Sequence, residues 1–172
     1  MRWLYRVGQF CRHVVARPAA LDEAPAVALL TPEALALFRR MPPGDRRHAL
    51  TVLARLRDAG PVPVDLATAA LLHDVGKGLV GPAPVWRALV VLAGKRGRGA
   101  LERLASGDSR SWRYPLHVAL YHPALGAELC RRAGCSPAVV RLVRLHDAPN
   151  TPDLDSQAAR DLAALHAVDD IS

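Results

Sequence analysis

The apolar residues of this chain recur at helical spacing, and no segment alternates apolar and polar residues as a half-buried strand does. Segments rich in Leu, Ala and Val are separated by glycines and prolines, which often end helices. Hydrophobic residues make up 51% of the 172 residues but aromatic residues only 5%, so the core must rest on aliphatic side chains. The chain length suits one domain. Together these features predict an all-α protein, a bundle of about seven or eight helices.

Local start and stop signals predict where these helices begin and end. Thr31, followed by a proline and a glutamate, is expected to cap a helix. Asp45 is expected to cap a helix that ends near Ala59, and Asp65 to cap one that ends at Gly76. The remaining helices are expected at 84–94, 99–106, 115–131, 136–147 and 155–170, with a break at the glycine-rich GKRGRG and a loop at SGDSRSW.

The first 30 residues are expected to be separate from the helical domain, which then spans 31–172. Residues 1–17 carry four arginines and no acidic residue, and their apolar residues recur at helical spacing. An amphipathic helix of this kind either packs on its own domain or contacts a membrane surface or a partner protein. Residues 18–30 are rich in Ala and Pro and are expected to form a linker.

Cysteine usage and hydropathy predict a cytoplasmic protein, with any peripheral membrane contact limited to residues 1–17. The three cysteines are an odd number with no CxxC, which argues against a disulfide framework or a cysteine zinc site. No segment approaches the roughly 20 apolar residues of a membrane span. Arginines interrupt the apolar residues of the start, so no signal peptide is expected.

The string LLHDVGKG at 71–78 places His73 and Asp74 at the end of an apolar helix. A buried carboxylate is costly unless it is paired or bound to a metal, and imidazole with carboxylate suits Zn, Mn or Fe. The glycines are expected to turn the backbone sharply and leave space above a metal. Lys77 places a cation where a substrate phosphate would arrive. The structural alternative is a capping aspartate beside a core histidine.

Two further candidate ligands, His48 and Asp169, are expected on other helices, as in metal sites of helix bundles. The order His48, His73-Asp74, Asp169 resembles the H…HD…D pattern of the HD superfamily of metal-dependent phosphohydrolases. The resemblance covers roughly residues 44–172. It implies an all-helical fold, a metal held by these four side chains and hydrolysis of a phosphoester.

HDVGK also resembles the HDxGK motif of the subgroup that includes the HD-GYP cyclic di-GMP phosphodiesterases. His122, Pro123 and Gly126 match its HPxxG motif, and His146 falls where it has HHE. This resemblance implies that His122 and His146 hold a second metal and that Asp74 bridges the two ions. The implied cofactor is one or two divalent transition-metal ions, Mn, Fe, Zn, Ni or Co.

The chain departs from that subgroup around His146. Leu145 stands where the first histidine of HHE would be, Asp147 replaces the glutamate, and no GYP follows. Cyclic di-GMP is therefore not an expected substrate, and the number of metals is left open. Outside a metal site, His122 would be an ordinary helix N-terminal residue and His146 would interact with a helix dipole. His166 lies near Asp169 on one helix face and is expected to be a hydrogen-bond partner, not a ligand.

The basic surplus predicts an anionic partner. Lys plus Arg number 23 against 16 acidic residues, a formal net charge of +7. This charge either attracts an anionic phosphoester, binds nucleic acid non-specifically, or forms a solvated face. No basic motif with interleaved aromatic residues occurs, so no specific nucleic-acid partner is expected.

The sequence thus leads to one expected function and one alternative. The expected function is hydrolysis of a phosphoester, of a nucleotide or another small phosphate ester, by attack of metal-bound hydroxide. Asp74 and Lys77 are the expected catalytic residues, and Lys77 is expected to act on the chemistry without affecting folding or metal binding. Whether the ester is a monoester or a diester is not resolved. The alternative is an HD-type ligand-binding or signalling module without turnover, which Leu145 and the shortened final loop favour.

Overall fold

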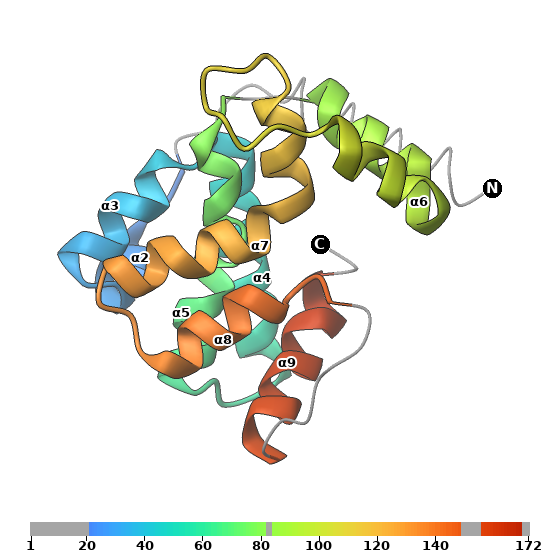
Figure 1. Cartoon of the computed structure of the whole chain (residues 1–172). Helices are drawn as coiled ribbons and strands as arrows, with labels where there is room; N and C mark the ends of the chain where they lie inside the picture. The colour runs from blue at the N-terminus through green and yellow to red at the C-terminus, as the bar shows by residue number, and fades with distance from the viewer. Residues whose placement is uncertain (1–20, 82–83, 149–155, 170–172) are drawn as a thin grey trace.

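The structure, a computed structural model, describes residues 21–81, 84–148 and 156–169 (Figure 1). Within these residues all regular secondary structure is helical, which confirms the predicted all-α fold. The elements are α2 (Ala24–Leu29), α3 (Pro32–Arg40), α4 (Pro43–Ala59), α5 (Val64–Leu72), the 3-10 helix η1 (Val75–Leu79), α6 (Pro84–Leu104), α7 (Tyr114–Arg132), α8 (Pro137–Leu145) and α9 (Ser156–Asp169).

Helix α5 is the centre of the bundle. Its sequence, VDLATAALL, is apolar on nearly every side, and six of its nine residues are buried. A helix of this kind must be covered all round, and α5 contacts α2, α3, α4, α8 and α9. Because α5 ends inside the bundle, the next two residues, His73 and Asp74, are buried as well.

The second half of the bundle is built on α7. This helix packs against η1 on one side and against α8 on another, and α6 also packs against it. In Figure 1 α6 projects away from the other helices. A small separate cluster of Leu101, Leu116 and Leu120 holds α6 to the first half of α7.

Several predicted boundaries are confirmed and others are wrong. The Thr31 hydroxyl accepts a hydrogen bond from the backbone of Ala34, and Gly60 ends α4 with a φ of 147°. Asp45 and Asp65 are not the N-cap residues: α4 and α5 begin earlier, after Pro42 and Pro63, and each aspartate lies in a first turn. Proline fixes φ near −65° and needs no backbone donor, so it can replace a capping side chain at these starts.

The predicted break at GKRGRG is also wrong, since α6 is one helix of 21 residues. Glycine costs a helix only about 1 kcal/mol relative to alanine. It ends a helix where the backbone adopts a positive φ, which among the described glycines holds only for Gly60 and Gly134. An ion pair between Arg98 and Glu102 spans Gly99, the third glycine of this segment, and supports the helix there.

The described part of the expected linker is structured. Residues 24–29 form α2, and Ala26 and Leu30 are buried in the main core. Glu23 pairs with both Arg39 and Arg46, which fixes the start of α2 to the helices that follow. The packed unit therefore begins before residue 31. The helix expected at 1–17, with its predicted membrane or partner contact, lies outside the described residues.

No helix in the described part of the chain has the combined length and apolarity that a membrane crossing requires.

The start of α8 provides a test of this packing. The Ser136 hydroxyl accepts from the backbone of Val139 at 3.2 Å and donates to Asp65 at 2.8 Å, so it both caps α8 and attaches it to α5. Ser136→Ala should lower the free energy of unfolding by about 2 kcal/mol in urea denaturation. Thr31→Ala, which loses only a cap, should cost about 1 kcal/mol. Equal losses would show that the bond to Asp65 contributes nothing.

Candidate metal centre

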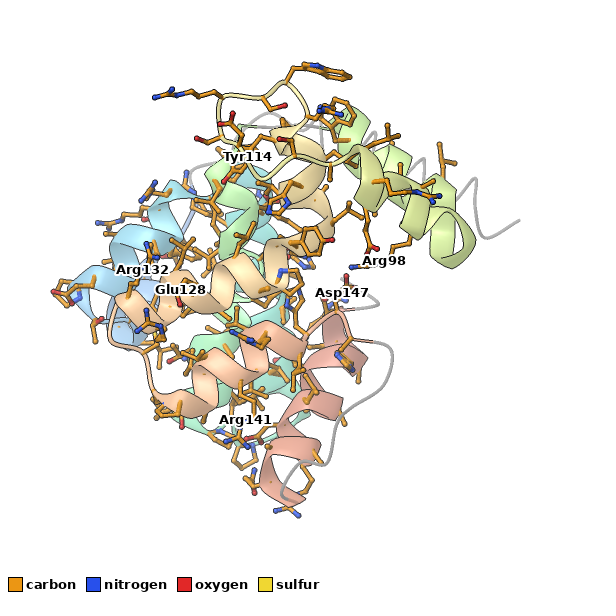
Figure 2. All side chains as sticks on the ribbon, viewed as in Figure 1. Arg98, Tyr114, Glu128, Arg132, Arg141 and Asp147 are labelled. Carbon is orange, nitrogen blue, oxygen red and sulfur yellow. The ribbon has the colours of Figure 1, made fainter. Side chains whose placement is uncertain are left out.

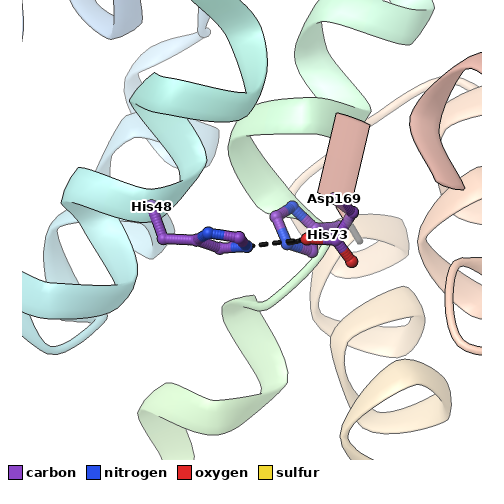
Figure 3. A group of neighbouring side chains, drawn as sticks. All are labelled: His48, His73 and Asp169. Carbon is purple, nitrogen blue, oxygen red and sulfur yellow. Dashed lines mark hydrogen bonds and ion pairs between the residues drawn. The ribbon is translucent and has the colours of Figure 1, made fainter. Parts of the chain in front are cut away.

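All six predicted metal ligands lie close together inside the bundle, in two sets of three. Within each set, one candidate ligand atom per residue lies within 4.8 Å of the others. The first set, drawn in Figure 3, comes from α4, from the residue after the end of α5 and from α9. The second set comes from the next residue along the chain after α5, from α7 and from the end of α8. The two sets are His48, His73 and Asp169, and Asp74, His122 and His146.

Asp74 lies between the two sets. Its Oδ1 is 3.6 Å from Nε2 of His122 and 3.5 Å from Nε2 of His146. Its Oδ2 is 3.6 Å from Nε2 of His73, which belongs to the first set. One carboxylate thus faces imidazole nitrogens of both sets, which is the arrangement that a bridging ligand requires.

Three of the histidines are oriented in the same way. The rings of His73, His122 and His146 each donate Nδ1–H to the backbone carbonyl three residues earlier, at 2.9, 3.3 and 2.7 Å. A carbonyl can only accept, so this bond fixes the proton on Nδ1 and leaves Nε2 with its lone pair. Histidines that ligate metals are held in this manner by a partner on the other ring nitrogen.

Two buried polar atoms of the centre lack a partner. Nε2 of His73 and Oδ1 of Asp74 have no hydrogen-bond partner among the described residues, although both side chains are less than 5% exposed. The nitrogen–oxygen distances of 3.5–3.6 Å around them exceed those of a hydrogen bond. Two donor atoms each about 2.1 Å from a tetrahedrally coordinated ion lie about 3.4 Å apart. The spacing and chemistry of these atoms therefore fit a metal ion.

The first set is closed by a hydrogen bond and is more open to solvent. Nε2 of His48 lies 2.7 Å from Oδ1 of Asp169, a bond shown in Figure 3. These two side chains are 20% and 27% exposed, whereas His73 is 1% exposed. A metal ion in this set would take the place of the proton in that bond.

Burial and neighbouring charges decide the ionisation of the second set. Burial raises the pKa of the Asp74 carboxyl, but the neighbouring Lys77 ammonium, the largest of the opposing causes, helps to hold this pKa well below its usual range. Burial, reinforced by Lys77, lowers the pKa of His122 to about 3. At neutral pH the set therefore offers an ionised carboxylate and a neutral imidazole, the forms that bind metal ions.

Lys77 forms an ion pair with the candidate ligand Asp74. Its Nζ donates to Oδ2 of Asp74 at 2.5 Å. The side chain is 24% exposed, so one end of it reaches solvent. Because it neutralises a buried carboxylate, we now expect Lys77 to contribute to folding as well as to the chemistry.

The two motif glycines contact each other. A Cβ on Gly76 would overlap the carbonyl oxygen of His122 and lie 2.9 Å from the backbone nitrogen of Gly126, and a Cβ on Gly126 would lie 3.1 Å from the backbone nitrogen of Gly76. These glycines allow the backbones of η1 and α7 to touch. The expectation that the glycines turn the backbone sharply and open space is wrong for Gly76, which has no positive φ.

The remaining residues singled out by the sequence lie around the centre. Leu145 packs against the main core, and its carbonyl accepts from His166 at 3.3 Å. His166 thus forms a hydrogen bond, but with α8 and not with Asp169 on its own helix face as expected. Asp147 is exposed. His117 stacks with Tyr114 and belongs to neither set. Residue 13 and residue 170 lie outside the described part of the chain.

Comparison of the chain with protein-family models, with curated proteins and with solved structures finds no match.

Sequence reasoning missed the backbone carbonyls that orient the histidines, the Lys77–Asp74 ion pair and the contact of the two glycines. The ion pair could have been found, because residues three apart on a helical turn are neighbours. The glycine contact had a partial signal, since each motif has a glycine within four residues of a candidate ligand. The carbonyls had a signal only where a proline follows His122.

Substitution of Gly76 tests the glycine contact. Gly76→Ala must push η1 away from α7, since the obstructing atoms belong to the backbone. It should lower the free energy of unfolding by about 3 kcal/mol or more, measured by urea denaturation. Gly99→Ala is the matched control, because a Cβ there meets no atom within 4 Å. It should raise stability by about 0.5–1 kcal/mol, the usual gain in a helix. Similar small effects for both variants would contradict the contact.

Proposed function

We propose that this protein is a metal-dependent phosphohydrolase of the HD type, with two divalent transition-metal ions bridged by Asp74. The observation that carries the proposal is the position of the Asp74 carboxylate between lone-pair nitrogens of both ligand sets. Imidazole and carboxylate ligands suit Mn, Fe, Co, Ni or Zn. Sites with two ions about 3.5–4 Å apart are typical of enzymes that displace groups at phosphorus.

When bound, the ions supply a nucleophile from water near neutral pH and offset charge on the phosphoryl oxygens. The residues of the chain position these groups. Asp74 is fixed by burial and by Lys77, and the three imidazoles are fixed by backbone carbonyls, so little reorganisation is needed when substrate arrives. With Asp74 shared, the described residues supply four ligands to one ion and three to the other, which leaves coordination positions for water and substrate on ions that accept five or six ligands.

The substrate class follows from charge and access. Lys77 and the ligands His48 and Asp169 have the partly exposed side chains of the centre, so a phosphoester would approach from their side. The Lys77 ammonium has three donors, so while one is bonded to Asp74 another could donate to a phosphoryl oxygen. A fixed cation there is most useful as negative charge develops in the transition state. The net charge of +7 favours a small anionic ester or a nucleotide.

A ligand-binding module without turnover is the second candidate. The observation that favours it is Leu145, which packs in the core at the position where the resembling subgroup has a ligand. The second set then has only Asp74, His122 and His146. Metal content and hydrolysis together separate the two candidates, because a module binds metal without cleaving any ester.

Metal analysis tests the centre directly. The purified protein should hold about two ions per chain, His122→Ala about one, and Asp74→Ala close to none. His117→Ala is the control, since its ring lies outside both sets, and should match the wild type. A strong chelator should lower the melting temperature of the wild type, because ions bind the folded state preferentially. Wild-type metal content in Asp74→Ala would overturn the assignment, and wild-type content in His122→Ala would reduce it to one ion.

Lys77 variants test the proposed chemistry on a panel of phosphomonoesters, phosphodiesters and nucleotides. Lys77→Ala should lower turnover of the best ester roughly 100- to 1,000-fold, by analogy with loss of one transition-state donor. It should also lower the melting temperature of the metal-free protein, because the buried Asp74 loses its cation. Saturating metal should shrink that difference. Lys77→Arg keeps the charge with a different shape and should restore the melting temperature more fully than the turnover.

Full activity of Lys77→Ala would contradict the proposed role of Lys77 in the chemistry. A metal-loaded wild type that cleaves no ester would favour the ligand-binding module.

A further inference from the structure

The carbonyls that orient the metal-facing histidines are not ordinary helix carbonyls. The last four carbonyls of an α-helix have no intrahelical donor. Helix α5 ends at Leu72, and the ring of His73 uses the carbonyl of Ala70. Helix α8 ends at Leu145, and the ring of His146 uses the carbonyl of Val143. Each ring thus bonds to a carbonyl in the last turn of its own helix.

His122 has the same bond without a helix end. It lies near the middle of α7, whose two ends Figure 2 marks with Tyr114 and Arg132. Its ring bonds to the carbonyl of Ala119, which in an uninterrupted helix would accept from the backbone N–H of residue 123. Residue 123 is a proline and has no N–H. The carbonyl is therefore available to the imidazole.

We propose that Pro123 is a positioning residue of the metal centre: it frees the Ala119 carbonyl and so gives His122, in mid-helix, the acceptor that helix ends give His73 and His146. This inference rests on the proposed metal-dependent function. Pro123 contacts no substrate and supplies no ligand. It acts through the tautomer and the orientation of the His122 ring, which direct Nε2 toward Asp74.

The neighbouring carbonyl of α7 is also used by a side chain. Nη2 of Arg98, which Figure 2 shows extending from α6, donates to the carbonyl of Leu120 at 3.3 Å. Figure 1 shows α7 changing direction along its length, as expected where a proline ring displaces the preceding turn. Two successive carbonyls before the proline are thus reached by side chains, His122 and Arg98, as happens where a helix is locally opened.

The inference predicts opposite effects on stability and on metal affinity. Pro123→Ala restores a backbone donor to the Ala119 carbonyl and removes an unfavourable residue from a helix interior, so the metal-free protein should melt at a higher temperature. The new donor competes with the His122 ring, and losing such a supporting bond typically weakens metal binding 10- to 100-fold. A residue that merely supported the fold would move both quantities in the same direction.

Zinc affinity is measured by competition with a chromophoric chelator, on the full chain, alongside the melting temperature of the metal-free protein. Pro123→Ala should bind zinc in the second set 10- to 100-fold more weakly and melt higher than the wild type. Pro137→Ala is the matched control: this proline occupies the first position of α8, where no backbone donor is needed. It should leave zinc affinity unchanged. Unchanged zinc affinity in Pro123→Ala, or a parallel loss of affinity and stability, would overturn the inference.

Nitrogen NMR of the metal-free wild type separates this inference from the proposed function. The His122 ring should carry its proton on Nδ1, and Pro123→Ala should shift the ring toward the other tautomer. If the wild type shows this tautomer but binds no zinc, the proposed function fails and the positioning by Pro123 stands. If the wild-type proton lies on Nε2, the inference about Pro123 fails whatever metal the centre binds.

Discussion

The buried carboxylate of Asp74 is the constraint on which the rest of the centre depends. Removing an ionised carboxylate from water is costly unless charge and hydrogen bonds replace the lost hydration. Lys77 supplies one cation, but Oδ1 faces only the lone pairs of His122 and His146 and has no partner among the described residues. Hydrogen-bond acceptor atoms that face one another repel unless a positive charge lies between them. A metal ion would supply that charge, so these atoms would bind an ion strongly.

The two sequence motifs contact each other in the structure. Asp74 and Gly76 come from the HDVGK string, and His122 and Gly126 from HPALG, yet the carboxylate faces the imidazole and the glycine backbones touch. The glycines bring the backbones of η1 and α7 together, and that approach sets the distance between the two ligands. Changing a glycine is therefore expected to disturb metal binding without touching a ligand. Fold and site depend here on the same few atoms.

The sequence allowed prediction of the all-α fold and of the ligands, because both depend on residue type and order. The approach of His48 and Asp169 across 121 positions followed only from the resemblance, since spacing alone does not place α4 beside α9. The wrong predictions arose where glycines and prolines were assumed to interrupt helical structure. The glycines of GKRGRG lie within α6, and the Ala/Pro-rich segment forms part of the core. Tertiary packing outweighed local propensity in the Ala/Pro-rich segment, whereas in α6 the small cost of each glycine was not enough to end the helix.

A helix bundle offers few places where an imidazole can be fixed by the backbone of its own helix. Free carbonyls occur at helix C-termini, so a centre with several such histidines needs several helix ends to meet. The ends of α5 and α8 meet here, but α7 must continue past the centre to pack against α8. A proline inside α7 reconciles the two demands, because it frees one carbonyl while the helix continues for nine more residues after Pro123. The local loss of helix stability is then a direct consequence of building the centre in the middle of a long helix.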